Sequence, residues 1–475
     1  MQPVEQLYQA YLASRTVTTD SRAITPGCIF FAFKGEHFDG NAFAPKALEQ
    51  GAALCVVSEE WKAESGKWKD DDSIIGVPDV LATLQELARE HRRHLTIPVI
   101  GITGTNGKTT TKELVHAVLQ KRYRTAATKG NFNNHLGVPL TLLSIPADAE
   151  IAIVEMGANH PGEIEQLCGI AAPDCGLITN VGRAHLEGFG SFEGVVQTKT
   201  ELYRHLAANR GLVFVNADNE RLMHEAERLA TIPDTPSFIP AYAPGTPILT
   251  SQKIDDTLLA LLTYGRSQEA DIRGTLVTTP TSDLHPQTSP YLHFYFEVGD
   301  NVYNVHTHLL GDYNFDNCMA AVAVGLHFGV EPFDIKEAIE EYQPSNNRSQ
   351  FKRTGRNTLY LDCYNANPSS MAVAIESFGR LGADHKVAII GGMHELGSAE
   401  HKEHERLVAE LEAIHPDQCL LVGPEFDRIA LPPYMLRFAD TDALLAHLKA
   451  NPVNGATVLV KGSNTNRLWT VEESL

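Results

Sequence analysis

A short stretch rich in glycine and threonine constrains the fold of this chain most. Residues 97–100 (IPVI) are apolar, and residues 101–110 read GITGTNGKTT. Apolar side chains then recur at helical spacing from Leu114 to Leu119. A strand, a glycine turn and a helix in this order form a phosphate site, because the N–H groups of the turn and the positive end of the helix dipole converge on an anion.

The side chains of this stretch predict a nucleotide bound together with magnesium. Lys108 would reach the outer phosphates, and the hydroxyl of Thr109 would bind Mg²⁺. The generic P-loop has four residues between its glycines, whereas five separate Gly101 from Gly107. The nucleotide-binding residues predicted here are Gly104, Thr105, Asn106, Gly107, Lys108, Thr109 and Thr110.

Length and charge narrow the class of protein. The 475 residues are too many for a single core, so we expect two to four domains. A net charge of −20 without a basic block argues against nucleic-acid partners. The sequence has no apolar run of about 20 residues, no signal-peptide pattern, and seven scattered cysteines. We therefore expect a cytoplasmic protein that is not inserted in a membrane and whose thiols are reduced.

The first unit, residues 1–96, reads as a small α/β domain. Strands are predicted at 28–33 and 53–57, and helices at 41–50 and 80–95. Polar clusters stand at the strand ends and contain Ser21, Arg22 and Lys34. Such residues either form surface turns or bind an anionic ligand, and we name these three as candidates for the second role.

The second unit, residues 97–310, alternates strands with helical segments, which favours a parallel sheet. Strands are predicted at 151–157, 176–182 and 212–218. Residues 291–298 and 301–309 alternate in polarity around a Gly-Asp turn, which predicts a hairpin that forms an antiparallel flap.

Two polar features of this unit suggest ligand contacts. Asn133 and Asn134 lie in a loop over residues 130–139 whose amides suit a polar ligand. Glu155 lies in the apolar run 151–157, at the end of the predicted strand. An acid at the carboxyl end of a strand near a phosphate loop is well placed to hold Mg²⁺, although a structural ion pair is the alternative.

The third unit, residues 311–475, is a further α/β domain with a mostly parallel sheet. Its strands are predicted at 359–362, 387–390, 419–422 and 457–460, with helical stretches between them.

Five strings now occur in one order: GTNGKT at 104–109, GNFNN at 130–134, VEMGANH at 154–160, AHLEGF at 184–189 and YNANP at 364–368. Together they resemble the Mur ligases over nearly the whole chain. The resemblance implies three α/β domains: one for the UDP-sugar, a central P-loop-type ATPase, and a Rossmann-like C-terminal domain that closes over ATP and the acceptor.

The asparagine loop and the VEMGANH string resemble those members that join D-alanyl-D-alanine to UDP-MurNAc-tripeptide. The implied reaction uses ATP to form an acyl phosphate and gives the pentapeptide precursor of peptidoglycan. A sister ligase that adds one amino acid, a folate-type polyglutamate ligase and an ATP-hydrolysing switch are alternatives. The single-residue sister usually carries Asp-Asn-Pro-Arg, whereas Ser369 follows the proline here. We expect a monomer; the third residue of the tripeptide stays open.

The resemblance also implies roles for charged residues of the central unit. Glu155 and His185 would help to hold Mg²⁺, one of them at a second ion. Lys199 matches a carbamylated lysine, which a neutral amine forms with carbon dioxide. A surface lysine, and a surface or core histidine, are the structural alternatives.

In the third unit, the resemblance implies ATP contacts from Asn314, Arg348 and Asp362. Acceptor contacts are implied for Tyr364, Asn365 and Asn367, while Lys461 either binds a carboxylate or is merely exposed. The chain departs from the family pattern at Tyr313, where histidine is common, and at Cys363, where serine is usual. It also has Gly392 where the family carries the acid of a Gly-Asp-Met string.

Overall fold

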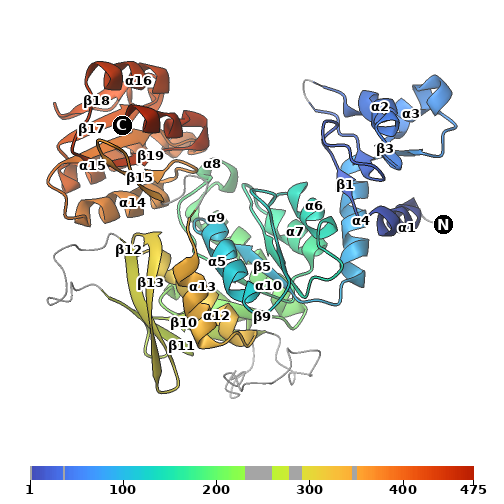
Figure 1. Ribbon diagram of the computed structural model, residues 1–475, viewed down its shortest axis with the longest axis horizontal. Helices are drawn as coiled ribbons and strands as arrows, with labels where there is room; N and C mark the ends of the chain where they lie inside the picture. The colour runs from blue at the N-terminus through green and yellow to red at the C-terminus, as the bar shows by residue number, and fades with distance from the viewer. Residues whose placement is uncertain (1–2, 36–37, 231–258, 278–290, 345–349) are drawn as a thin grey trace.

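The structure, a computed structural model, describes residues 3–35, 38–230, 259–277, 291–344 and 350–475. Within these residues the strands form three sheets of four, nine and six strands. Figure 1 shows the small first sheet and the C-terminal sheet on opposite sides of the larger central one. The three-domain α/β architecture predicted from the sequence is confirmed, whereas the boundaries at 96 and 310 stay a prediction.

The first sheet is fully parallel and small. Its order is β1 (Val17–Thr18), β2 (Ile29–Phe31), β3 (Leu54–Ser58) and β4 (Ile74–Val77). Short helices α2 (Ala44–Glu49) and α3 (Glu59–Glu64) accompany it, and the longer helices are α1 (Pro3–Ser14) and α4 (Val80–His94). The predicted strands and helices of this unit are present; β1 and β4 were not predicted, because β1 is very short and β4 carries a glycine.

The central sheet is parallel except at one edge. Its strands are β5 (Val99–Thr103), β6 (Thr125–Ala127), β7 (Ile151–Glu155), β8 (Cys175–Ile178), β9 (Leu212–Asn216), β10 (Ala260–Gly265), β11 (Ile272–Leu276), β12 (Tyr291–Val298) and β13 (Asn301–Leu310). They lie in the order β13-β12-β11-β10-β9-β8-β5-β7-β6. The hairpin β12–β13 is antiparallel, so the predicted flap on a parallel sheet is confirmed. Because β5 lies between β7 and β8, the loops that follow these three strands meet at one edge.

Helices cover both faces of the central sheet. The helices of this part of the chain are α5 (Lys108–Gln120), α6 (Gly137–Leu143), α7 (Glu163–Ala171), α8 (Leu186–Phe189), α9 (Phe192–Lys199), α10 (Glu201–Ala208), α11 (Glu220–Leu229), α12 (Asn314–His327) and α13 (Pro332–Glu341), of which α8 lies beside the C-terminal domain rather than on the sheet (Figure 1). Helices α5, α12 and α13 share one apolar core with the sheet. On the other face α6, α7 and α10 share a core with α1 and α4. Helices from the flanking segments of the chain therefore complete the central domain.

The C-terminal sheet has one antiparallel edge strand, β14 (Gln350–Arg353). The parallel strands follow in the order β15 (Thr358–Asp362), β19 (Thr457–Lys461), β16 (Lys386–Gly391), β17 (Gln418–Val422) and β18 (Met435–Phe438). Its helices are α14 (Pro368–Arg380), α15 (Glu400–Ile414) and α16 (Thr441–Ala450). The four predicted strands are present; β14 and β18 mix charged with apolar residues and were not predicted.

The seven cysteines are all buried and unpaired, in agreement with the expectation of reduced thiols. In the described part of the chain, no helix has both the length and the apolar character needed to cross a membrane.

Candidate active site

The phosphate loop connects β5 to α5, as the sequence predicts. Gly104 and Gly107 have φ angles of +144° and +78°, which favour glycine. A Cβ atom at Gly104 would lie 2.0 Å from the hydroxyl of Thr179, and one at Gly107 would lie 2.5 Å from the amide oxygen of Asn317. Both glycines are therefore required by conformation and by space.

Lys108 is the first residue of α5, and its side chain folds back over the loop. Its Nζ donates to the carbonyl oxygens of Gly104 at 2.7 Å and Thr105 at 3.1 Å. This places an ammonium group at the positive end of the helix, where an anion is favoured. Thr110 lies in the same first turn.

The loop carries a hydroxyl–carboxylate contact that suits a hard cation. Thr109 Oγ1 donates to Glu155 Oε2 at 3.0 Å, and Asn133 Nδ2 donates to Glu155 Oε1 at 2.8 Å. Glu155 ends β7 and is 1% exposed. Oxygen donors of this kind are the ligands that Mg²⁺ prefers. The described residues contain no cluster of three or more His, Cys, Asp and Glu side chains that could hold a metal without help from other groups.

Lys199, the last residue of α9, is buried beside this loop. It is 2% exposed, and its Nζ donates to the carbonyl oxygen of Ala158 at 3.3 Å, just beyond β7. Burial and the nearby charge of Lys108 hold the pKa of the Lys199 amine well below its usual value. The alternative of a solvated surface lysine does not hold, because the side chain is buried.

His185 lies near both lysines but is paired with a residue of the C-terminal domain. Its φ angle is +50°, and its Nδ1 forms a close contact with Glu395 Oε2. Burial lowers the pKa of His185, with added lowering from Lys108 and Lys199, although Glu395 opposes this shift. The imidazole is thus near the phosphate loop, with one nitrogen held from across the domain junction.

The asparagines named from the sequence behave differently from one another. Asn106 receives a hydrogen bond from Asn367 of the C-terminal domain at 2.8 Å. The amide oxygen of Asn134 accepts from two backbone N–H groups at the start of α6. Asn314 is buried, and both polar atoms of its side chain are bonded within its own segment.

The acceptor candidates gather at the carboxyl ends of β15 and β19. Lys461 Nζ lies 2.6 Å from Asp362 Oδ2, and it donates to the carbonyl oxygen of Asn365 at 3.2 Å. Lys461 is 1% exposed, so the alternative of an exposed lysine is wrong. Asn365 is exposed, and Tyr364 is half-buried next to it.

The candidates of the first domain lie at the carboxyl ends of β1 and β2, on the far side of the molecule from the C-terminal sheet (Figure 1). Arg22 pairs with Asp20 at 2.8 Å, and its side chain is 88% exposed. Ser21 is half-buried and Lys34 is exposed. Arg348 lies outside the described residues.

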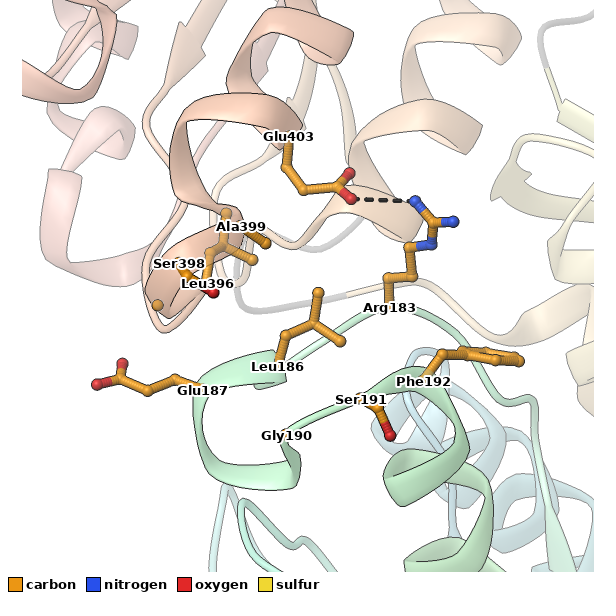
Figure 2. A pocket seen from close by; sticks show the side chains of 11 residues that line it. Arg183, Leu186, Glu187, Gly190, Ser191, Phe192, Leu396, Ser398, Ala399 and Glu403 are labelled. Carbon is orange, nitrogen blue, oxygen red and sulfur yellow. Dashed lines mark hydrogen bonds and ion pairs between the residues drawn. The ribbon is translucent and has the colours of Figure 1, made fainter.

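Sequence reasoning missed the contacts that join Arg183, three residues before α8, to the C-terminal domain. Arg183 and Glu403 both line a pocket of about 430 Å³, and Figure 2 shows them paired, with 3.0 Å between Nη1 and Oε1. The backbone N–H of Arg183 also donates to Ser369 Oγ at 2.7 Å. No local pattern marks these residues, because the partners are 186 and 220 positions apart in the sequence.

Comparison with known proteins agrees with this geometry. Three family models match the chain: "Mur ligase family, catalytic domain" over residues 14–92, "Mur ligase middle domain" over 102–232, and "Mur ligase, glutamate ligase domain" over 347–464.

Two curated relatives are similar over nearly their whole length. The UDP-N-acetylmuramoyl-tripeptide–D-alanyl-D-alanine ligase of Bacillus subtilis is 31% identical, covering 97% of this chain and 92% of the relative. The ligase of the same name from Escherichia coli is 30% identical, covering 99% and 95%. Among solved structures, MurF ligase from Thermotoga maritima in complex with ADP has a TM-score of 0.78 at 27% identity, covering 98% of this chain and 97% of its own.

Proposed function

The chain belongs to the Mur ligase family, and on this premise we propose that it joins D-alanyl-D-alanine to UDP-MurNAc-tripeptide at the expense of ATP. It is an ATP-dependent carbon–nitrogen ligase of peptidoglycan synthesis, and its product is UDP-MurNAc-pentapeptide. The observation that carries this function is the phosphate loop, where Thr109 donates a hydrogen bond to Glu155 and the amine of Lys199 is buried nearby.

The chemistry requires an activated carboxylate. The terminal carboxylate of the tripeptide attacks the γ-phosphorus of ATP, which releases ADP and leaves an acyl phosphate. The amine of the dipeptide then attacks the acyl carbon, loses a proton, and displaces inorganic phosphate. Two anions must meet in the first step, so positioning and positive charge determine its rate. Lys108 at the helix N-terminus supplies part of that charge.

Magnesium fits the oxygen donors of this site. Thr109 and Glu155 would hold the ion, and His185 would contribute at a second ion through Nε2, the ring nitrogen that does not contact Glu395. Bound Mg²⁺ neutralises the phosphate oxygens and the developing charge. Asn314, Arg348 and Asp362 would contact the rest of ATP.

Lys199 is proposed to act as a carbamate. A neutral amine adds to carbon dioxide and releases a proton, which turns the uncharged group into an anion able to bind Mg²⁺. The lowered pKa of Lys199 supports this, because only the neutral amine reacts.

Replacing Lys199 with Ala should lower kcat about a hundredfold or more. Bicarbonate should raise the activity of a carbon dioxide-depleted wild type but not that of the variant, whereas the exposed Lys402→Ala control should behave as wild type. Full activity in Lys199→Ala would refute the carbamate.

The remaining candidates divide between the two substrates. Ser21, Arg22 and Lys34 would bind the UDP end, with Asn133 and Asn134 near the tripeptide. Tyr364, Asn365, Asn367 and Lys461 would bind the dipeptide. We further propose that the protein acts as a monomer in the cytoplasm, where UDP-linked precursors are made.

The deciding experiment measures phosphate release with ATP, Mg²⁺, UDP-MurNAc-tripeptide and D-alanyl-D-alanine, omitting each in turn. Release that needs all four, with the pentapeptide identified by mass, supports the proposal. Release with a single amino acid in place of the dipeptide would indicate a sister ligase, and folate-dependent release a polyglutamate ligase. Release with ATP and Mg²⁺ alone would indicate a hydrolytic switch.

A further inference from the structure

A buried carboxylate in the C-terminal domain occupies the space that two glycines leave free. Gly392 follows β16 and Gly423 follows the neighbouring strand β17. A Cβ atom added at Gly392 would lie 2.2 Å from Glu425 Oε2, and one at Gly423 would lie 2.1 Å from the same oxygen. Glu425 therefore depends on glycine at both positions, and an acidic side chain at 392 would fill the place that its carboxylate fills now.

This carboxylate has one oxygen engaged and one without a partner. Glu425 Oε1 lies 3.3 Å from Nδ1 of His394, and the side chain is 9% exposed. Oε2 is buried and makes no hydrogen bond to any residue that the structure describes. Both residues line a cavity of about 450 Å³ at the carboxyl edge of the sheet. Burying a carboxylate is costly unless it is paired or hydrogen-bonded, because it gives up its hydration.

The residue after His394 connects this acid to the active site. Glu395 has a φ angle of +60°, a conformation that non-glycine residues rarely adopt. Its carboxylate contacts His185, and its carbonyl oxygen accepts from the backbone N–H of Glu187 at 3.3 Å. The loop that Glu425 holds through His394 is thus the loop that reaches the phosphate-loop side of the junction.

We propose that Glu425 is a positioning residue of the ligase, which supplies from the segment after β17 the carboxylate that the family's Gly-Asp-Met string carries at position 392. It fixes His394 and so presents Glu395 to the central domain. This inference rests on the proposed function for its kinetic readout only.

The test exchanges the acid between the two positions. Glu425→Gln and Glu425→Ala should each lower kcat about tenfold while KM for ATP changes less than about twofold. Gly392→Asp alone should also lower kcat, because two carboxylates then collide. The double variant Gly392→Asp with Glu425→Ala should recover at least about fivefold over Glu425→Ala. Wild-type kcat in Glu425→Gln, or a double variant no better than Glu425→Ala, would overturn the proposal.

A matched control and a second readout separate this proposal from the ligase assignment. Glu405 also lies 3.3 Å from a histidine, His401, but its side chain is 57% exposed, and Glu405→Gln should behave as wild type. Amide hydrogen exchange over residues 393–397 should rise about tenfold in Glu425→Ala and fall back in the double variant. This measurement needs no substrate, so it decides the positioning role even if wild-type protein showed no ligase activity; unchanged exchange would count against that role.

Discussion

The two junctions of the central domain differ in their chemistry. At the first, α1 and α4 share one apolar core with α6 and α7, and Tyr11 donates to the carbonyl oxygen of Leu143 at 2.9 Å. At the second, beside the phosphate loop, hydrogen bonds and ion pairs join the domains: Asn106 with Asn367, Arg183 with Glu403, and His185 with Glu395.

The difference indicates which junction moves. Separating apolar helices exposes their surface to water, which costs about 25 cal/mol per Å². Polar groups at an open surface exchange a protein partner for water at a net cost of only about 1 kcal/mol each. We therefore expect the first domain to stay fixed on the central one, while the C-terminal domain opens and closes over ATP.

The largest effect should come from the apolar junction. Leu87 of α4 is fully buried in the shared core, so Leu87→Ala should lower the free energy of unfolding by about 2–5 kcal/mol. Denaturant unfolding measures this loss. The exposed Glu86→Ala on the same helix should change stability by less than about 0.5 kcal/mol. A loss below about 1 kcal/mol for Leu87→Ala would mean that the apolar junction is not tight.

Acid should weaken the same junction. His91 of α4 is 2% exposed, and burial lowers its pKa to about 4, below its usual 6.5. The unfolded chain therefore binds the proton first, so stability is complete above pH 6.5 and is lost as the pH falls toward 4. Between pH 7 and 5 the loss should be on the order of 1–2 kcal/mol. His91→Phe should flatten this dependence, and an equal slope in the variant would exclude His91 as its source.

At the polar junction, Asn367 has two roles that substitution can separate. Its oxygen caps α14 by accepting from the N–H of Ser370 at 2.9 Å, and its amide donates to Asn106. Asn367→Ala should cost about 1 kcal/mol through the lost cap. Asn367→Ser keeps a capping oxygen but is too short to reach Asn106, so it should cost a few tenths of a kcal/mol. Both variants should shift X-ray scattering toward the open form; a compact Asn367→Ser would show that the bond to Asn106 does not hold the junction.

Salt should have the smallest effect and act on one junction only. Raising the ionic strength from about 0.1 to 1 M shortens the Debye length from about 10 to 3 Å, which weakens the pair of Arg183 with Glu403. The radius of gyration should rise slightly, whereas stability of the apolar junction should not fall. Compaction by salt would contradict the assignment of the polar junction as the mobile one.

The sequence could predict those features of the fold and the site that adjacent residues define. The phosphate loop, Glu155 and the buried strands were predicted, because a glycine turn between a strand and a helix is defined by adjacent residues. Lys199 was singled out only through the family resemblance, since nothing in its own sequence neighbourhood distinguishes a buried lysine from an exposed one.

Contacts between segments that lie far apart in the sequence could not be predicted from it. Lys461 pairs with Asp362 because β15 and β19 are neighbours in register, although 99 positions separate them. Glu395 and Glu403 contact His185 and Arg183, just before α8, from more than 200 positions away. The space above Gly392 is visible only once β17 lies beside β16, so the departure at this glycine could be noticed but not explained.

Because the native cysteines are buried, cysteines introduced on the surface can be labelled selectively to follow the moving junction. Burial raises the pKa of Cys55, Cys363 and Cys419 to about 12, and it raises the pKa of Cys168, Cys175 and Cys318 further still. Because the thiolate is the reactive form, these cysteines resist maleimide at neutral pH. Fluorophores can therefore be attached at two introduced surface cysteines on the otherwise unaltered chain, one on each side of either junction. Energy transfer between them would follow domain closure during turnover without removing any native residue from a core.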